Sequence, residues 1–408
     1  MATGASPLPL NGMETNPDQH FRAHGQEIRT EPPQGRLYHL DAVRSFCLVY
    51  GFFLHAATTD LTGQLWFVRE VSSFFRMAAF FLVSGFFGAM LLRRMSVADF
   101  LRKRSLNLLV PLAAGLVLLN PVTIYLVFVH HNGMAHPADV LWGDLMEDAA
   151  GQMPWHLHFW FLMSLFVYSL LTPLLVAVAA PLATGRVLSG LNNMRRNVLL
   201  IALAACAGAG VVLGLGFFKV VLEPVLEATP FSWVVRITFN YLPFYCIGVL
   251  MFACAPVYRA LHRPGLLALV AGALVFAALT VWLDGERASG VARVVYYAAK
   301  NFVILIVVAA LLAAGEALFS REIPVVSYLG ERIYTGYVLH FGIIYMLALG
   351  LGPLGLPSAA QYILIACGAL AIACCLHGLV IVRSPLLQFL FNGKPLGERA
   401  KAAPRARG

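Results

Sequence analysis

Residues 40–57 read LDAVRSFCLVYGFFLHAA, an apolar stretch that carries three ionisable side chains, Asp41, Arg44 and His55. Its length suits a transmembrane helix, because about 20 apolar residues cross the hydrocarbon core of a bilayer. Arg44 and His55 are eleven residues apart, which at about 100° per residue places both on one helix face, and Asp41 lies one turn before Arg44. Ionisable groups inside a membrane are costly and usually face a functional interior. The stretch therefore predicts a membrane helix with a functional stripe.

A purely structural interpretation of the same three residues is also open. Asp41 would cap the helix, Arg44 would reach the cytoplasmic headgroups, and His55 would bond to a neighbouring helix. The energetic cost of three such groups on one stripe favours the functional interpretation.

The composition places this stretch within a membrane protein. Of 408 residues, 60% are hydrophobic and only 12% are charged, whereas a soluble domain has about 25% charged residues. The apolar runs are long and lack the alternation of an outer-membrane barrel. We therefore expect an all-α multi-pass protein with the lipid bilayer as its surroundings. We assign the net charge of +9 to loops and tails at the membrane surface, so no nucleic-acid partner is expected.

Ten apolar windows have the length of a membrane span. They fall near residues 40–58, 72–92, 106–130, 157–180, 198–217, 234–254, 265–283, 301–319, 334–350 and 360–382. With the N-terminus inside, 21 of the 29 Lys and Arg residues fall in internal segments and 6 in external ones. The positive-inside rule then predicts that both termini are cytoplasmic.

The chain divides by composition into three parts. Residues 1–36, rich in Pro, Gly, Asn and Gln, predict a disordered cytoplasmic tail. Residues 37–383 are the expected membrane domain, and residues 384–408 are an expected basic cytoplasmic tail. We expect the protein in the bacterial inner membrane.

Other polar side chains lie within or beside predicted spans. Arg76 falls in the external half of the second span, His158 and Trp160 begin the fourth, and His340 lies in the ninth. A lone buried His is more often a satisfied core group than a catalyst, and Trp160 also fits an aromatic belt at the membrane interface. We expect no metal site, because the pair His156 and His158 has no nearby Cys or carboxylate ligands.

Five segments, in order along the chain, resemble the acyltransferase-3 family of integral membrane acyltransferases. In the first segment, Asp41 and Arg44 form an Asp-x-x-Arg pattern, and Arg44 and His55 form an Arg-x10-His pattern. The other four segments are FFLVSGFF at 80–87, HFWFL at 158–162, YLPFYCIGVLM at 241–251 and IYTGYVLH at 333–340. Ile333 stands where the family often has Ser, and Ala78 where a Pro is frequent, which leaves the substrate open. Phe-Arg-Met at 75–77 and the lack of an appended esterase domain most resemble members that transfer succinyl groups to periplasmic glucans.

The resemblance implies an O-acyltransferase that moves a succinyl or acetyl group from cytoplasmic acyl-CoA to a hydroxyl of an envelope glycan. It implies that Arg44 and His55 act in donor binding and catalysis. An imidazole can accept a hydroxyl proton, and a guanidinium binds anions. We therefore expect His55 as general base, Arg44 on the donor and Asp41 orienting Arg44. Arg76, His158, Trp160 and His340 are expected to contact substrate. Acyl-CoA is expected as a co-substrate, with no permanently bound cofactor.

Two other classes of protein remain open from the residues alone. Buried charges and helices interrupted by Gly or Pro also mark the paths of transporters and exporters, although no matched inverted halves are evident. A non-catalytic membrane scaffold is the other alternative, and the ionisable stripe of the first span argues against it.

Overall fold

A computed structural model describes residues 37–142, 155–282 and 289–396. These residues form helices joined by short turns, without a strand among them. Nine helical runs in this part of the chain are long and apolar enough to cross a membrane, and a bent pair is a tenth candidate. The all-α multi-pass class is thereby confirmed, whereas the side of the membrane on which the termini lie stays a prediction.

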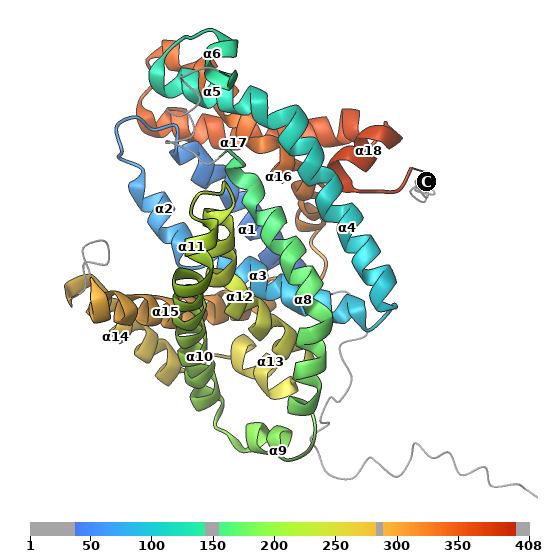
Figure 1. The fold of residues 1–408 in the computed structure, drawn as a ribbon, viewed down its shortest axis with the longest axis vertical. Coiled ribbons are helices and arrows are strands. Elements are labelled where there is room, and N and C mark those ends of the chain that lie inside the picture. The colour runs from blue at the N-terminus through green and yellow to red at the C-terminus, as the bar shows by residue number, and fades with distance from the viewer. Residues whose placement is uncertain (1–36, 143–154, 283–288, 397–408) are drawn as a thin grey trace, which may run out of the picture. The chain divides into compact units, whose positions relative to one another are not determined.

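The helices follow the predicted windows in order (Figure 1). The runs are α1 (Tyr38–Ala57); α2 (Trp66–Ser73) with α3 (Arg76–Leu92); α4 (Val97–Ala114) with η2 (Gly115–Leu119) and α5 (Asn120–Asn132); η3 (Leu157–Phe159) with α8 (Trp160–Leu182); α10 (Arg196–Phe217) with η4 (Phe218–Leu222) and α11 (Glu223–Leu226); α12 (Ser232–Ala253); α13 (Ala255–His262) with α14 (Leu266–Trp282); α15 (Gly290–Leu318); α16 (Pro324–Leu351) with η5 (Gly352–Leu354); and α17 (Ser358–Leu376) with η6 (His377–Ile381). Three short helices complete the described part of the chain, α6 (Pro137–Trp142), α9 (Gly185–Asn193) and α18 (Pro385–Asn392).

Several helices extend beyond the apolar windows that predicted them. The third run begins at Val97, well before residue 106, because the Ser96 hydroxyl caps it by accepting a hydrogen bond from the Asp99 amide at 3.1 Å. The charged residues 102–104 are therefore helical. The seventh span is the bent pair, with 65° between α13 and α14, and Pro264 and Gly265 occupy the break.

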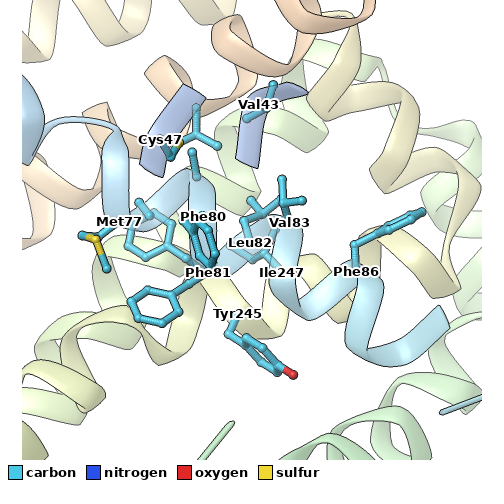
Figure 2. Packing of buried hydrophobic residues seen from close by; sticks show 14 of the residues in the cluster. Val43, Cys47, Met77, Phe80, Phe81, Leu82, Val83, Phe86, Tyr245 and Ile247 are labelled. Carbon is cyan, nitrogen blue, oxygen red and sulfur yellow. The ribbon is translucent and has the colours of Figure 1, made fainter. Parts of the chain in front are cut away.

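Helix α3 is the most deeply buried span and lies between α1 and α12. Figure 2 shows its side chains between Cys47 of α1 and Tyr245 of α12. The approach of α3 to α12 requires glycine on both helices: a Cβ at Gly85 would overlap the Tyr245 carbonyl, and a Cβ at Gly248 would overlap that of Leu82. Small residues allow such close backbone packing in membranes.

Helix α1 also contacts α15, α16 and α17, so other spans surround much of it. At the end of the described chain, α18 packs against α4 and lies in the segment predicted as a basic tail. The predicted disordered tail at 1–36 and residues 397–408 lie outside the described residues.

Candidate functional site

Three histidines from distant parts of the sequence meet inside the helical bundle. His55 comes from the last turn of α1, His158 from η3 and His340 from the middle of α16. The ring centroids are 5.1 Å apart for His55 and His340, 4.8 Å for His158 and His340, and 6.4 Å for His55 and His158. The fold thus joins the first, fourth and ninth predicted spans at one point.

The backbone at His158 is held in an unusual conformation. Leu157 has φ of 48°, in the left-handed region that non-glycine residues rarely adopt. Two residues before Leu157, the carbonyl oxygen of Trp155 accepts a hydrogen bond of 2.9 Å from the Asn120 side-chain amide. Strained backbone of this kind is often retained at functional sites. The conformation of Leu157 places the side chains of His156 and His158 in different surroundings.

His156 and His158 do not face the same surroundings. The His156 ring stacks on Trp233 at 5.4 Å, and its Nδ1 lies 3.0 Å from the Leu157 carbonyl oxygen. Burial lowers the pKa of His156, so the imidazole is neutral at pH 7. Among the described residues, no group of three or more His, Cys, Asp or Glu side chains is arranged to hold a metal ion.

The buried His nitrogens are incompletely paired. His340 Nδ1 lies 2.6 Å from the Tyr337 carbonyl oxygen, so this nitrogen carries the proton and donates. His340 Nε2 is buried without a hydrogen-bond partner in the described chain. Buried polar atoms in native proteins are nearly always bonded. His340 Nε2, next to the rings of His55 and His158, is therefore free to bond to a water or a ligand.

A small cavity of about 20 Å³ opens between these helices, which is enough space for a water or a group of similar size. Four residues singled out from the sequence line it together, namely His55, Arg76, His158 and Trp160. The other lining residues are Cys47, Leu48, Met77, Phe80, Phe161 and Tyr337. His340 contacts the lining histidines through its ring. The cavity therefore combines imidazole and guanidinium groups within an apolar wall.

Two residues that the sequence reasoning did not select complete the site. The Tyr337 hydroxyl donates to the His158 carbonyl oxygen at 2.6 Å, and the Phe341 ring stacks on His158 at 5.2 Å and meets His55 at 4.7 Å. Tyr337 belongs to the quoted segment IYTGYVLH and lies one turn before His340. The i, i+3 spacing was the signal that could have identified it.

Arg44 and Asp41 lie elsewhere, in a second cavity of about 110 Å³. Arg44 Nη2 is 3.4 Å from Asp41 Oδ1, and the guanidinium lies over the Phe87 ring at 5.4 Å. Arg321 and the hydroxyl-bearing residues Tyr38, Ser45 and Ser327 also line this cavity. Arg44 and His55 are both in α1, but about 16 Å of helix rise separates them. Arg44 therefore lines the larger cavity and His55 the smaller one.

Chemically, the two cavities are complementary. The smaller one offers an imidazole that can exchange a proton with a hydroxyl, next to a permanently charged guanidinium. The larger one offers two guanidiniums that suit phosphate or carboxylate groups. Together they fit a reaction that needs both proton transfer and anion binding.

Comparison with known proteins agrees with this chemistry. The acyltransferase domain that defines the acyltransferase-3 family matches residues 37–378. The chain is 26% identical to glucans biosynthesis protein C of Escherichia coli K12 over 402 residues, which is 92% of this chain and 99% of the relative. It is also 26% identical over 401 residues to the protein of that name from E. coli O157:H7, with the same coverage.

No solved structure is significantly similar to the chain. The match of the acyltransferase domain nevertheless extends over most of the chain and includes all five segments that carried the resemblance. The predicted family is confirmed: this chain is a multi-pass membrane protein that belongs to the acyltransferase-3 family of acyltransferases.

Proposed function

We propose that this protein is an O-acyltransferase of the bacterial inner membrane, which moves a short acyl group from cytoplasmic acyl-CoA to a hydroxyl of a periplasmic glucan or related envelope glycan. The observation that carries the proposal is the cavity lined jointly by His55, His158, Arg76 and Trp160. The acceptor class is supported by the name of the E. coli relatives, glucans biosynthesis protein C.

In this proposal the acceptor hydroxyl oxygen attacks the carbonyl carbon of the thioester. His55 accepts the hydroxyl proton as the new C–O bond forms. The C–S bond then breaks, and the proton passes from His55 to the leaving thiolate, so that the products are the glycan ester and free coenzyme A. The reaction needs no reactant other than the acyl-CoA and the glycan.

The remaining residues bind or position the reactants. Arg44, held at 3.4 Å from Asp41, together with Arg321 in the larger cavity, binds the phosphates of the donor. Trp160 lines the smaller cavity and is partly exposed, so its ring can stack on a sugar that lies outside the water-sized space. His340 donates to the Tyr337 carbonyl oxygen and packs on His55, which positions the base.

The decisive experiment uses purified protein in detergent, without any ion gradient. Incubation with succinyl-CoA or acetyl-CoA and a periplasmic glucan should release free thiol and add the acyl mass to the glucan. Thiol release and glycan mass spectrometry measure both products. Movement of glycan across proteoliposomes without acyl transfer would instead identify the alternative, a transporter or exporter.

A further inference from the structure

Arg76 is the first residue of α3, and its half-buried side chain lines the smaller cavity together with His55. Its Nε donates to the Ser72 hydroxyl at 2.9 Å, which orients the guanidinium and leaves the two Nη groups as further donors. A Cβ at Gly51 would lie 3.3 Å from Nη1, so this glycine leaves space for the guanidinium beside α1. Gly51 precedes His55 by four residues, hence both lie on one face of α1. The positive charge of Arg76 is therefore held next to the proposed base.

This guanidinium has no counterion among the described residues. No carboxylate forms an ion pair with Arg76 there, and Asp60 uses its carboxylate within the turn between α1 and α2. Phenols and thiols are mainly uncharged at neutral pH, so they do not balance an arginine. These are the titratable groups that act on Arg76, from Tyr50, Tyr241, Tyr337 and Cys47.

The space beside Arg76 has the size of one oxygen atom. The cavity of about 20 Å³ takes a single water-sized group. It is open rather than enclosed, so a larger reactant can place one terminal atom in it while the rest stays outside. The carbonyl oxygen of the thioester is such an atom, because it is bonded to one carbon only and carries no hydrogen. It also gains negative charge when a hydroxyl attacks that carbon.

We propose that Arg76 is a catalytic residue that stabilises the oxyanion formed at the thioester carbonyl, whichever acyl group is transferred. This inference rests on the acyl transfer proposed above. As the acceptor oxygen bonds to the carbonyl carbon and His55 accepts its proton, the π electrons of the C=O bond move to the carbonyl oxygen beside Arg76. They return to re-form the C=O bond when the C–S bond breaks and the thiolate leaves.

The missing counterion of Arg76 is then the oxyanion itself. The guanidinium is charged before the substrate arrives, because arginine stays protonated in proteins. It meets a full negative charge only in the tetrahedral intermediate and the transition states that flank it. An interaction that is stronger in the transition state than in the bound substrate raises kcat and leaves KM almost unchanged.

The test measures kcat and KM of the purified protein with acetyl-CoA and with succinyl-CoA, for the wild type, Arg76→Gln and Arg76→Lys. Loss of one oxyanion donor costs about 10²- to 10³-fold in kcat. Arg76→Gln should lose about that factor with every donor that the wild type uses, while each KM changes less than about threefold. Arg76→Lys should fall between, because it keeps the charge and loses the planar guanidinium. Arg236→Gln, an exposed residue of α12, is the matched control and should keep the wild-type kcat.

Thermal unfolding in detergent separates this catalytic role from a structural one. Arg76→Gln removes a charge that has no counterion, so its Tm should equal or exceed that of the wild type although its activity is lost.

Three results would overturn the proposal while acyl transfer itself stood. One is a wild-type kcat in Arg76→Gln. Another is a loss confined to KM, or to only one of two donors that the wild type uses, which would make Arg76 a binding residue for the donor. The third is a lower Tm of Arg76→Gln together with a wild-type kcat in Arg76→Lys, which would make Arg76 a structural cation. A wild-type protein that transfers neither acyl group would refute the proposed function, and the catalytic role of Arg76 with it.

Discussion

The imidazole of His55 lies 5.1 Å from that of His340, ring centroid to ring centroid, although α1 and α16 are near opposite ends of the chain. Phe52, one turn before His55, packs on the same His340 ring at 4.9 Å. His340 donates through Nδ1 to the Tyr337 carbonyl oxygen, which fixes its orientation. These contacts fix the position of the His55 ring relative to His340, which the proposed role of His55 as general base requires.

His55→Gln should reduce acyl transfer by about 10²- to 10⁴-fold, because glutamine forms hydrogen bonds but cannot accept the hydroxyl proton. Protein abundance and membrane insertion should stay near those of the wild type. Thiol release from acyl-CoA and the acyl content of the glycan measure the effect. His156→Gln is the matched control, since His156 stacks on Trp233 and does not line the cavity. Wild-type activity in His55→Gln would make His55 a packing residue, and His340 would be tested next.

Arg44→Lys should weaken binding of acyl-CoA in detergent, because lysine keeps the charge but loses the planar fork that grips phosphate. Arg44→Ala should weaken it further. Calorimetric titration with a non-reactive acyl-CoA analogue measures the affinity, and Arg94→Lys, an exposed arginine beyond the end of α3, serves as control. If both Arg44 variants bound the donor as tightly as the wild type, the larger cavity would not be the donor site.

Membrane topology follows from the charge distribution. Reporter fusions after Ser96 and at the C-terminus should report the cytoplasm, and a fusion after His136 should report the external side. Alkaline phosphatase and fluorescent-protein reporters give opposite signals for the two sides. An external C-terminus would require an odd number of spans and would place His55 at the wrong depth for an external acceptor.

Gly248→Ala should destabilise the protein by about 1–3 kcal/mol, because the added methyl overlaps the Leu82 carbonyl where α12 meets α3. The backbone there cannot move without separating the two spans. Thermal unfolding in detergent measures the effect. Gly216→Ala in α10 is the control, since its Cβ would meet no atom within 4 Å, and it should leave the Tm unchanged or slightly higher. An equal Tm for both variants would mean that α3 and α12 are not closely packed.

Asp60→Asn should lower the Tm at pH 7 and lose its effect in acid. Partial burial raises the pKa of Asp60, but hydrogen bonds from Thr62 and Leu65 outweigh it and hold the pKa below its usual value of 3.8. The ionised carboxylate thus stabilises the folded turn between α1 and α2. This stabilisation is complete at a pH above the pKa that Asp60 has in the unfolded chain. It is lost as the pH falls through the lower pKa that Asp60 has in the folded protein. The Tm difference between wild type and variant should be constant from about pH 5 to 8, a range that lies about one to four pH units above the pKa of an unperturbed carboxyl group. The difference should shrink below about pH 4. A difference that grew on acidification would contradict this assignment.

The sequence by itself determined the class of protein, the order of the spans and the residues of one helix face. The hydrophobicity of a span depends only on its own residues, so a window of about 20 residues is enough to identify it. The helical repeat is also local, so Asp41, Arg44 and His55 could be assigned to one stripe before any tertiary contact was known. The family followed from short segments for the same reason.

Only the tertiary structure decided which of these residues share a cavity. The helical repeat assigns Arg44 and His55 to one face of α1, yet the two side chains line separate cavities. Arg76 of α3, His158 of η3 and Tyr337 of α16 join His55 of α1 at one cavity. Such contacts depend on how spans cross, and the crossing depends on features such as the paired glycines Gly85 and Gly248. Hydrophobicity and helical period carry no information on helix crossing, because both are averaged over a single span.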